Sequence, residues 1–477
     1  MKDFFFKILF GNLVSKIMLI VADGLAVLAL PGHDFGGFAL LQGLILSGSV
    51  IAAWGSDQAV ISVLGRSDIV RHDIAGYLSV IQRKVAFTSF VAAACVAVIA
   101  MGSRVSFSPY MLLASSLIIM FEAQLIVNAA MLRAWKRPYM AVILFDGLRH
   151  SSLLVGALTI YFSNSGFESL VYFWLFTSFL SFSIGALAKK QFLRGSGGEA
   201  LPAETLMHAG EIKRFSGLWA VMQSVVSRVV LVVSAYLLVP DELGQVAFFL
   251  KLMVVFTFLQ TVMVQALAPV IGRLATAENR DQARSIYRLS TFFLAATVSP
   301  IIGASLLAMD RIVYVFGVSY SGAWWPVTFL FFAQALNIGT GVIGQFILHF
   351  GYARLLLLVT IIGASFQCLL LFGLGHYFGV DGILISYAVS NVVLVILKNF
   401  LAARKVGFHG FSLPNLTVVG LIVAEVLILE MTTSAKDLSL AWLLFGHAVF
   451  CVFLVSVASV RVPEVFGWVT KRFSKDA

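Results

Sequence analysis

Long apolar runs recur along the chain, separated by short polar segments rich in Gly, Pro, Lys and Arg. Each run is close to, or longer than, the about 20 apolar residues that a helix needs to cross a bilayer. Because lipid cannot satisfy open backbone groups, such runs are predicted to be helices. The pattern predicts fourteen spans, at about residues 9–30, 36–55, 83–101, 109–131, 138–162, 167–187, 214–239, 244–271, 286–309, 323–349, 352–374, 379–402, 414–431 and 438–460.

Composition supports the same fold class. Hydrophobic residues make up 60% of the 477 residues and charged residues only 12%, about half the charged share of a soluble domain. This balance excludes intrinsic disorder, a collagen-like fibre and an ordinary soluble enzyme. We therefore predict an all-α polytopic membrane protein. The N-terminal run contains Lys16 and Asp23 and no clear cleavage site follows it, so we interpret it as an uncleaved first span.

Basic residues predict the orientation. With the N-terminus inside, most of the 33 Lys and Arg residues fall in cytoplasmic segments, whereas Arg104, Arg311 and Lys436 fall on the opposite face. This asymmetry places both termini in the cytoplasm and accounts for the net charge of +10 without a nucleic-acid partner. No external loop is long enough to form a domain. The longest connection, about 188–213, contains the flexible sequence Gly195–Gly198.

The chain shows signs of an internal duplication. The sequence Asp34-Phe35-Gly36 opens the second span, and Glu242-Leu243-Gly244 opens the eighth. Each of these spans ends near a Gly-Arg pair, at residues 65–66 and 272–273, and basic turns follow the fourth and tenth spans at 132–137 and 348–354. Since both halves begin inside, the repeat is predicted to be parallel. The predicted organisation is a six-helix bundle at 1–190, a linker at 191–212, a second bundle at 213–405, and two added spans with a tail at 406–477.

Motifs for covalent chemistry are absent from the sequence. It contains no GxxxxGK phosphate loop, no HExxH motif and no paired-Cys motif. Cys95, Cys368 and Cys451 lie within apolar runs and are interpreted as small hydrophobic residues. We therefore expect no catalytic residues, no metal site and no cofactor.

Polar side chains within the spans are the candidate functional residues, because such groups are costly in lipid and should face an interior or a wet cavity. The candidate substrate-binding cations are Lys16, Arg149, Arg228 and Lys251, and the candidate coupling or cavity residues are Asp23, Asp57, Glu122, Asp146, Gln334, Asn337 and Gln345.

Structural roles compete with these functional ones. Asp146 and Arg149 have the spacing of an intrahelical ion pair, and Lys16 could extend toward the interface. Gln334, Asn337 and Gln345 form one continuous stripe of a single span, which could line a cavity or bond to a neighbouring helix. Arg228 and Lys251 have no acidic residue within one turn, so each needs a partner elsewhere: an anionic substrate group, Glu122 or Asp23.

The order of several weak motifs carries a family resemblance. These are the entry to the second span at residues 34–40, its end at residues 55–59 followed by residues 64–66, the basic turn at 132–137, and Gly379-Val380-Asp381-Gly382-Ile383 opening the twelfth span. In these features, and in span number and loop lengths, the whole chain resembles the polysaccharide transporter (O-antigen flippase-like) branch of the multidrug/oligosaccharidyl-lipid/polysaccharide (MOP) exporter superfamily.

The resemblance implies two six-helix bundles around a central cavity, two appended helices, and alternating access. It implies a multi-pass protein of the bacterial inner membrane whose cargo is an oligosaccharide on a polyprenyl pyrophosphate, used for O-antigen, lipopolysaccharide, capsule or exopolysaccharide synthesis. Polymerases and glycosyltransferases would be its partners. Asp57 would mark the cytoplasmic mouth or stabilise the turn near it, and Tyr320, Trp324 and Trp325 would either stack on sugars or anchor the interface. The alternatives are a cation-coupled multidrug exporter of the same superfamily and a membrane glycan polymerase.

Overall fold

A computed structural model describes residues 2–64, 74–135, 138–163, 165–193, 202–274, 280–320, 322–410, 413–431 and 440–460. The regular structure within these ranges is helical throughout. The chain divides into two compact units, 1–248 and 249–477, which are described separately. The helices from the N-terminus into α10 are α1 (Lys2–Ala29), α2 (Gly32–Ala53), α3 (Ser56–Leu64), α4 (Ile74–Gly102), α5 (Pro109–Ala134), α6 (Pro138–Val142), the π-helix η2 (Ile143–Gly147), α7 (Leu148–Ser163), α8 (Glu168–Phe192), α9 (Ala203–Leu237) and α10 (Pro240–Leu274).

The boundary between the units falls inside α10, so only the first turns of α10 belong to the first unit. The remaining helices are α11 (Arg280–Leu307), α12 (Met309–Val315), α13 (Trp324–Gly339), α14 (Ile343–His349), α15 (Ala353–Lys405), α16 (Leu413–Met431) and α17 (Leu440–Val460). The two compact units are not the two bundles predicted from the sequence duplication, because compactness and duplication are different criteria. The bundle boundaries at the 191–212 linker stay a prediction.

The helices confirm a polytopic all-α membrane protein. Among the described residues, nine helices are long and apolar enough to cross a membrane, or ten if α13 and α14 form one bent span. One of the nine, α15, is far longer than a single span and turns at Gly379, whose φ is +57°. Its two halves double back on each other, since the Ser386 hydroxyl donates to the Leu370 carbonyl over 2.8 Å. The predicted spans 352–374 and 379–402 are these two halves.

The predicted span at 323–349 is not one continuous helix. It is broken into α13 and α14, which meet at an angle of 40°. At the break, Gly341 has a φ of +70°, and a Cβ there would lie 2.4 Å from Cγ2 of Thr291. At the same break, the Gly341 carbonyl accepts a hydrogen bond from Gln260 Nε2 at 2.9 Å. The prediction of one continuous polar stripe through Gln334 and Gln345 is therefore wrong.

In the first unit, α2 is the central helix and packs on α4, α5 and α9. Its end is set by Trp54 and Gly55, which take positive φ values of 41° and 68° before α3 begins. A Cβ on Gly55 would lie 2.6 Å from the Gly217 nitrogen of α9, so this crossing requires glycine. At the other end of α2, Gly36 packs on Gly244 in the first turns of α10. These two glycines occupy equivalent positions in the duplication predicted from the sequence.

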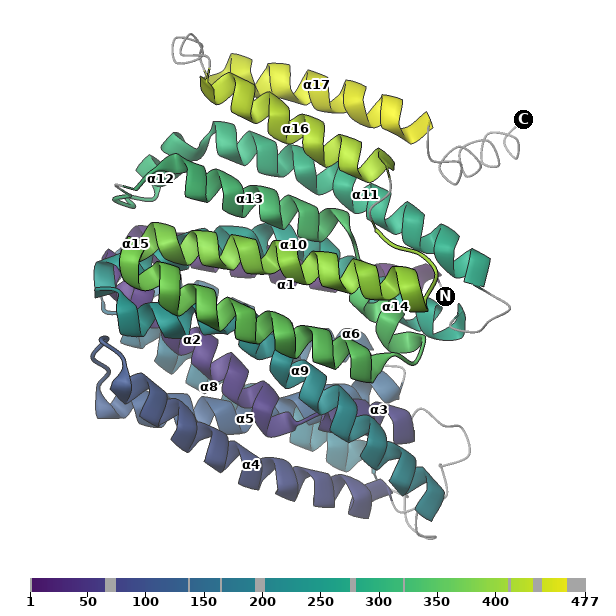
Figure 1. The fold of residues 1–477 in the computed structure, drawn as a ribbon. Coiled ribbons are helices and arrows are strands. Elements are labelled where there is room, and N and C mark those ends of the chain that lie inside the picture. The colour runs from purple at the N-terminus through teal and green to yellow at the C-terminus, as the bar shows by residue number, and fades with distance from the viewer. Residues whose placement is uncertain are drawn as a thin grey trace. The chain divides into compact units, whose positions relative to one another are not determined.

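The remaining packing of the first unit forms layers around α5 and α7. Helix α1 lies along α7, and α5 packs between α4 and α8. The start of α5 shows local sequence control, because the Ser108 hydroxyl accepts from the Met111 nitrogen and Pro109 occupies the first turn. In the second unit, α16 and α17 lie side by side and both contact α11 (Figure 1).

Four sequence motifs lie wholly or partly outside the described residues. They are the Gly65-Arg66 pair, Lys136 and Arg137 of the first basic turn, the linker glycines at 195–198, and the tail after residue 460.

Candidate functional site

Arg149 is the centre of a charged cluster inside the first unit. Its Nη2 lies 2.9 Å from Asp146 Oδ1, and its Nη1 lies 3.7 Å from Glu122 Oε2. The guanidinium also lies over the Phe145 ring, 5.1 Å from the centroid. Asp146 belongs to the π-helix η2, a local widening of the helix that often occurs at functional sites. The ion pair expected from the i, i+3 spacing is present, and Arg149 has a second carboxylate besides.

Glu122 is held by hydrogen bonds as well as by charge. The residue is 1% exposed, and its Oε1 accepts from Trp174 Nε1 and from the Ser178 hydroxyl, each at 2.9 Å. These donors come from α8, whereas Glu122 belongs to α5. The carboxylate therefore joins α5 to α8 and presents its other oxygen to Arg149. A buried acid with this set of donors has a structural role between the two helices.

His150 extends the cluster to α1. Its Nε2 lies 3.2 Å from Arg149 Nη2, and its Nδ1 lies 2.7 Å from the Ser15 hydroxyl. A guanidinium can only donate, so Nε2 accepts and the ring proton is on Nδ1, from which it is donated to Ser15. His150 is thus a neutral link between α7 and α1. Lys16, beside Ser15, lies within electrostatic range of Asp146 and Arg149.

Arg228 of α9 has a different environment. Its Nη1 donates to the Ser224 hydroxyl over 2.6 Å, and Ser224 donates in turn to Ser47 of α2 over 3.3 Å. Within the described part of the first unit, no carboxylate pairs with Arg228, and the nearby charge is the like charge of Arg149. Glu122, one of the partners considered from sequence, pairs with Arg149 instead. A membrane-embedded cation with one hydroxyl partner in its unit and a cationic neighbour suits an anionic ligand.

The remaining predicted residues lie elsewhere. Asp57 is in the first turn of α3, where its Oδ2 accepts from Gln58 Nε2 at 2.9 Å. Four of the others belong to the second unit: Lys251 is half-buried in α10, Gln334 is buried in α13, and Asn337 and Gln345 are half-buried in α13 and α14. Asp23 is half-buried in α1 and lies within electrostatic range of Lys16.

Sequence reasoning missed the groups that bind the charged residues. Ser15, Trp174 and Ser178 complete the cluster, yet they are 52 to 135 positions from their partners in the chain. Ser and Trp within apolar runs give no signal by themselves, because both are common in spans.

The Tyr320 ring is fixed at the end of the second unit by a carboxylate. Its hydroxyl donates to Asp381 Oδ1 over 2.6 Å, and the ring contacts Phe249 and Trp324. Burial, the hydrogen bond to Asp381 and the charge of that carboxylate together raise the pKa of Tyr320 above its ordinary value. Asp381 is the acid of the 379–383 motif, and it anchors the loop before α13.

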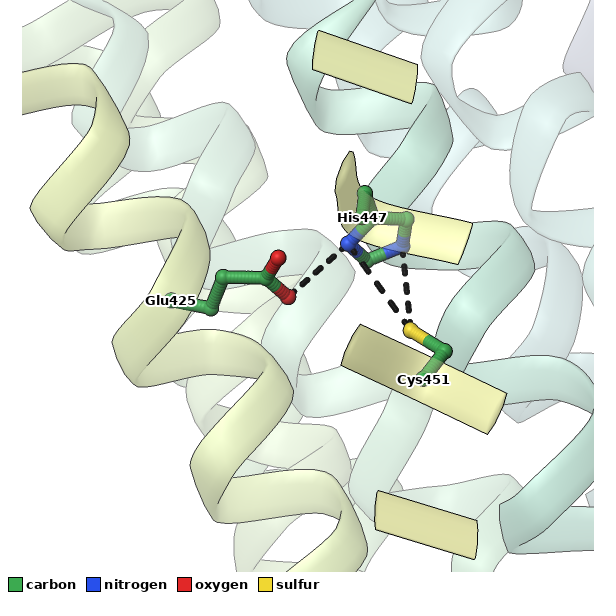
Figure 2. Close-up of side chains that lie close together, drawn as sticks. All are labelled: Glu425, His447 and Cys451. Carbon is green, nitrogen blue, oxygen red and sulfur yellow. Dashed lines mark hydrogen bonds and ion pairs between the residues drawn. The ribbon is translucent and has the colours of Figure 1, made fainter. Parts of the chain in front are cut away.

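One side-chain group among the described residues has the composition of a metal site: Glu425, His447 and Cys451 (Figure 2). Glu425 Oε2 lies 2.9 Å from His447 Nδ1, and His447 Nε2 lies 2.9 Å from the Pro300 carbonyl. The Cys451 sulfur is nearer to Nε2 than to Nδ1, at 3.4 and 3.8 Å. Because Nε2 donates to the carbonyl, Nδ1 is the ring atom left to bind a metal, and it already lies at hydrogen-bond distance from Glu425 Oε2.

That geometry fits a shared proton better than a metal. With Nε2 donating to the Pro300 carbonyl, a second proton must lie between Glu425 and His447, on the carboxylate or on the ring. A Cβ on Gly303 would lie 2.6 Å from His447 Cε1, so glycine at this position makes room for the ring. The pair links α16 and α17 to α11.

Solved structures with the same fold are named as flippases or transporters. The described chain matches "Lipid II flippase MurJ, inward closed conformation" with a TM-score of 0.64 at 12% identity, covering 94% of this chain and 97% of that one. It matches the MATE multidrug transporter DinF-BH with a TM-score of 0.62 at 16% identity, covering 85% of this chain and 95% of that one. The chain has the fold of the MOP superfamily.

A third structure with this fold is similar as well. It is a MOP superfamily transporter from Pyrococcus furiosus, described as having a reverse polarity of its binding pocket, with a TM-score of 0.58 at 16% identity over 85% of this chain and 96% of that one. No family model and no curated protein matches the sequence. The superfamily resemblance inferred from the motif order is thus confirmed at the level of the fold.

Proposed function

We propose that this MOP-fold chain is a transporter that moves a polyprenyl-pyrophosphate-linked oligosaccharide, or a related polysaccharide intermediate, across the inner membrane by alternating access. The observation that supports this proposal most directly is Arg228. It lies in a spanning helix beside Arg149, its partner within the first unit is the Ser224 hydroxyl, and no carboxylate among that unit's described residues pairs with it. An anionic group would supply the missing counter-charge.

The cargo chemistry matches that requirement. A pyrophosphate crossing about 30 Å of hydrocarbon needs its charge compensated along the way. Arg228 offers a guanidinium whose position is set by Ser224, and guanidinium groups bind phosphate oxygens in a bidentate manner. Lys16 and Arg149 add positive charge in the same unit. Lys251 is proposed as the corresponding cation of the second unit.

A cation-coupled multidrug exporter is the alternative, and the similarity to MATE structures makes it a concrete one. Such a transporter would need carboxylates available to bind cations. Glu122 and Asp146 are both paired with Arg149, and Glu122 also accepts from Trp174 and Ser178. These contacts favour a structural role for the two acids, and Asp23 stays a proposed coupling residue. A glycan polymerase is disfavoured because the sequence has no sizeable external loop.

The test is a complementation experiment in cells that lack the chain, with mass spectrometry of their polyprenyl lipids. We expect one polyprenyl-pyrophosphate glycan to accumulate and the wild-type chain to clear it. Arg228→Ala should fail to clear it, Arg228→Lys should restore part of the activity, and Arg133→Ala should behave as wild type because Arg133 is exposed at the end of α5. Lys251→Ala should fail like Arg228→Ala.

Two outcomes would contradict the proposal. An unchanged lipid pool, together with new sensitivity to cationic drugs, would favour the drug exporter. Full clearance by both Arg228→Ala and Lys251→Ala, at normal protein level, would remove the role of the cations. The proposed orientation, with both termini in the cytoplasm, and the proposed partnership with polymerases and glycosyltransferases rest on the sequence and are tested separately by tagging and cross-linking.

A further inference from the structure

A second site is present on the first unit, away from the Arg149 cluster. It is a pocket of about 830 Å³ formed by α4, α5 and α8. This volume lies within the range of about 300 to 1,000 Å³ found for small-molecule sites. The transport proposal above makes no use of this pocket.

The pocket is positively charged at one end. Arg83, Lys189 and Lys190 line it, and no acidic residue is among its described lining residues. Lys189 and Lys190 occupy the last turn of α8, where the chain reaches the end of the span. A smaller pocket of about 420 Å³ shares Arg83 and adds Lys84 and Lys213 nearby. This end of the first unit therefore carries a group of cations from three helices.

Lys189 is half-buried, whereas Arg83 and Lys190 are exposed. The hydrogen-bond partner of Lys189 in the pocket is a neutral side chain. Its ammonium donates to Gln82 Oε1, and Gln82 is itself held in place because its Nε2 donates to Asn128 over 2.9 Å. Gln124 donates to the Gln82 backbone carbonyl over 2.8 Å, which completes a fixed amide network at the pocket wall. A half-buried ammonium whose partner is an amide gains most from a negatively charged ligand.

The other end of the pocket is apolar. Met120, Phe121 and Phe182 line it, and the two phenylalanine rings pack together with centroids 5.5 Å apart. Phe182 lies two helical turns before Lys189 on α8, which corresponds to a depth of about 10 Å. The pocket therefore has a cationic end and an apolar wall. The distance between them is similar to the distance from the headgroup of a lipid to the first part of its chains.

We propose that this pocket binds an anionic membrane phospholipid, with its phosphate on Arg83, Lys189 and Lys190 and its first chain carbons against Phe121 and Phe182. Charge complementarity selects an anionic headgroup over a zwitterionic one. The cations lie at the end of the span, where headgroups are found, and basic pockets between spanning helices bind anionic headgroups in this way. The bound lipid would stabilise the packing of α4 and α8 against α5.

The experiment measures lipid binding to the full-length protein by native mass spectrometry, with phosphatidylglycerol and phosphatidylcholine as the probes. We expect phosphatidylglycerol to bind more tightly than phosphatidylcholine. At about 1 kcal/mol per basic residue near the surface, the variant Arg83→Gln/Lys189→Gln/Lys190→Gln should lose about a hundredfold in phosphatidylglycerol affinity. The matched control Arg133→Gln/Arg214→Gln/Arg284→Gln removes three exposed cations outside the pocket and should keep the preference.

A third variant separates the pocket from general surface charge. Ala186 lines the pocket and is exposed, so Ala186→Trp fills the space and leaves every charge in place. It should weaken phosphatidylglycerol binding as the charge variant does. Equal losses in the pocket and control charge variants, or normal binding to Ala186→Trp, would overturn the proposal. So would tighter binding of polyprenyl phosphate than of phosphatidylglycerol, which would make the pocket a site for the cargo.

Discussion

The contact between α2 and the start of α10 allows a quantitative prediction. Gly244→Ala would place a Cβ 2.2 Å from the Gly32 carbonyl oxygen and 2.8 Å from the Gly32 carbonyl carbon. Ordinary contact begins near 3.4 Å, so the two backbones would have to separate by about 1.2 Å. Because both atoms belong to the backbone, no rotamer change can relieve the clash. The substitution must displace one helix end from the other.

The cost follows from two opposing effects. Overpacking of this kind costs about 1 to 3 kcal/mol, whereas alanine in place of glycine within a helix gains about 0.5 to 1 kcal/mol. Because the clash is with backbone atoms, the cost lies in the upper part of its range, and the net result should be a loss of about 1 to 2 kcal/mol in the stability of the contact. Gly373→Ala is the matched control, because it lies within α15 and its Cβ would meet no atom within 4 Å. That variant should show only the gain.

The assay is disulfide cross-linking across the same contact. His33 and Asp241 face each other there, with Nδ1 and Oδ1 3.5 Å apart, so the pair His33→Cys/Asp241→Cys should oxidise readily in a background without the native cysteines. Adding Gly244→Ala should slow cross-linking about 5- to 30-fold, which corresponds to about 1 to 2 kcal/mol. Cross-linking at the same rate as in the Gly373→Ala control would refute the reasoning, because it would mean that the helix ends do not depend on glycine.

Three further outcomes are expected from other contacts. Glu122→Ala should lower the stability by about 1 to 3 kcal/mol, because it removes two interhelical hydrogen bonds of up to about 1.7 kcal/mol each. Glu122→Gln should lose less stability, since the amide oxygen can still accept from Trp174. Equal losses in thermal melts of the two variants would show that charge alone matters. Glu425→Gln should retain most of the stability, because an amide N–H can donate to His447 Nδ1, whereas Glu425→Leu should lose stability because it has no such donor. A thermal melt that ranks the two variants in reverse would contradict the shared proton. Because the pKa of Tyr320 is raised above its ordinary value of 10.0, its contribution to stability is complete below pH 10 and is lost as pH rises through the folded-state pKa; an alkaline denaturation curve unchanged by Tyr320→Phe would argue against this role.

The sequence by itself determined the fold class. An apolar run long enough to span a bilayer must be helical whatever surrounds it, because its backbone groups have no other partners in lipid. The runs that become α4, α5, α8 and the two halves of α15 were predicted on this local property alone. The ion pair of Asp146 and Arg149 was equally accessible, since residues three apart on a helix are neighbours.

Tertiary structure decided which polar groups meet. Glu122 accepts from Trp174 and Ser178 across 52 and 56 positions of sequence, and no periodicity within one helix reports such a contact. For the same reason the sequence left open whether Glu122 would pair with Arg228 or with another cation. The packing of α5, α7 and α8 places it against Arg149, and the partner of Arg228 in its unit is the Ser224 hydroxyl.

Breaks within apolar runs were also decided by packing. The hydrophobicity of residues 323–349 does not mark the end of α13, because α13 and α14 together are as apolar as a single span. The chain leaves the helix at Gly341, where the backbone takes a positive φ and passes too close to Thr291 to admit a side chain. Local chemistry thus determined that this segment crosses the membrane, and contact with a neighbouring helix determined that it crosses with a bend.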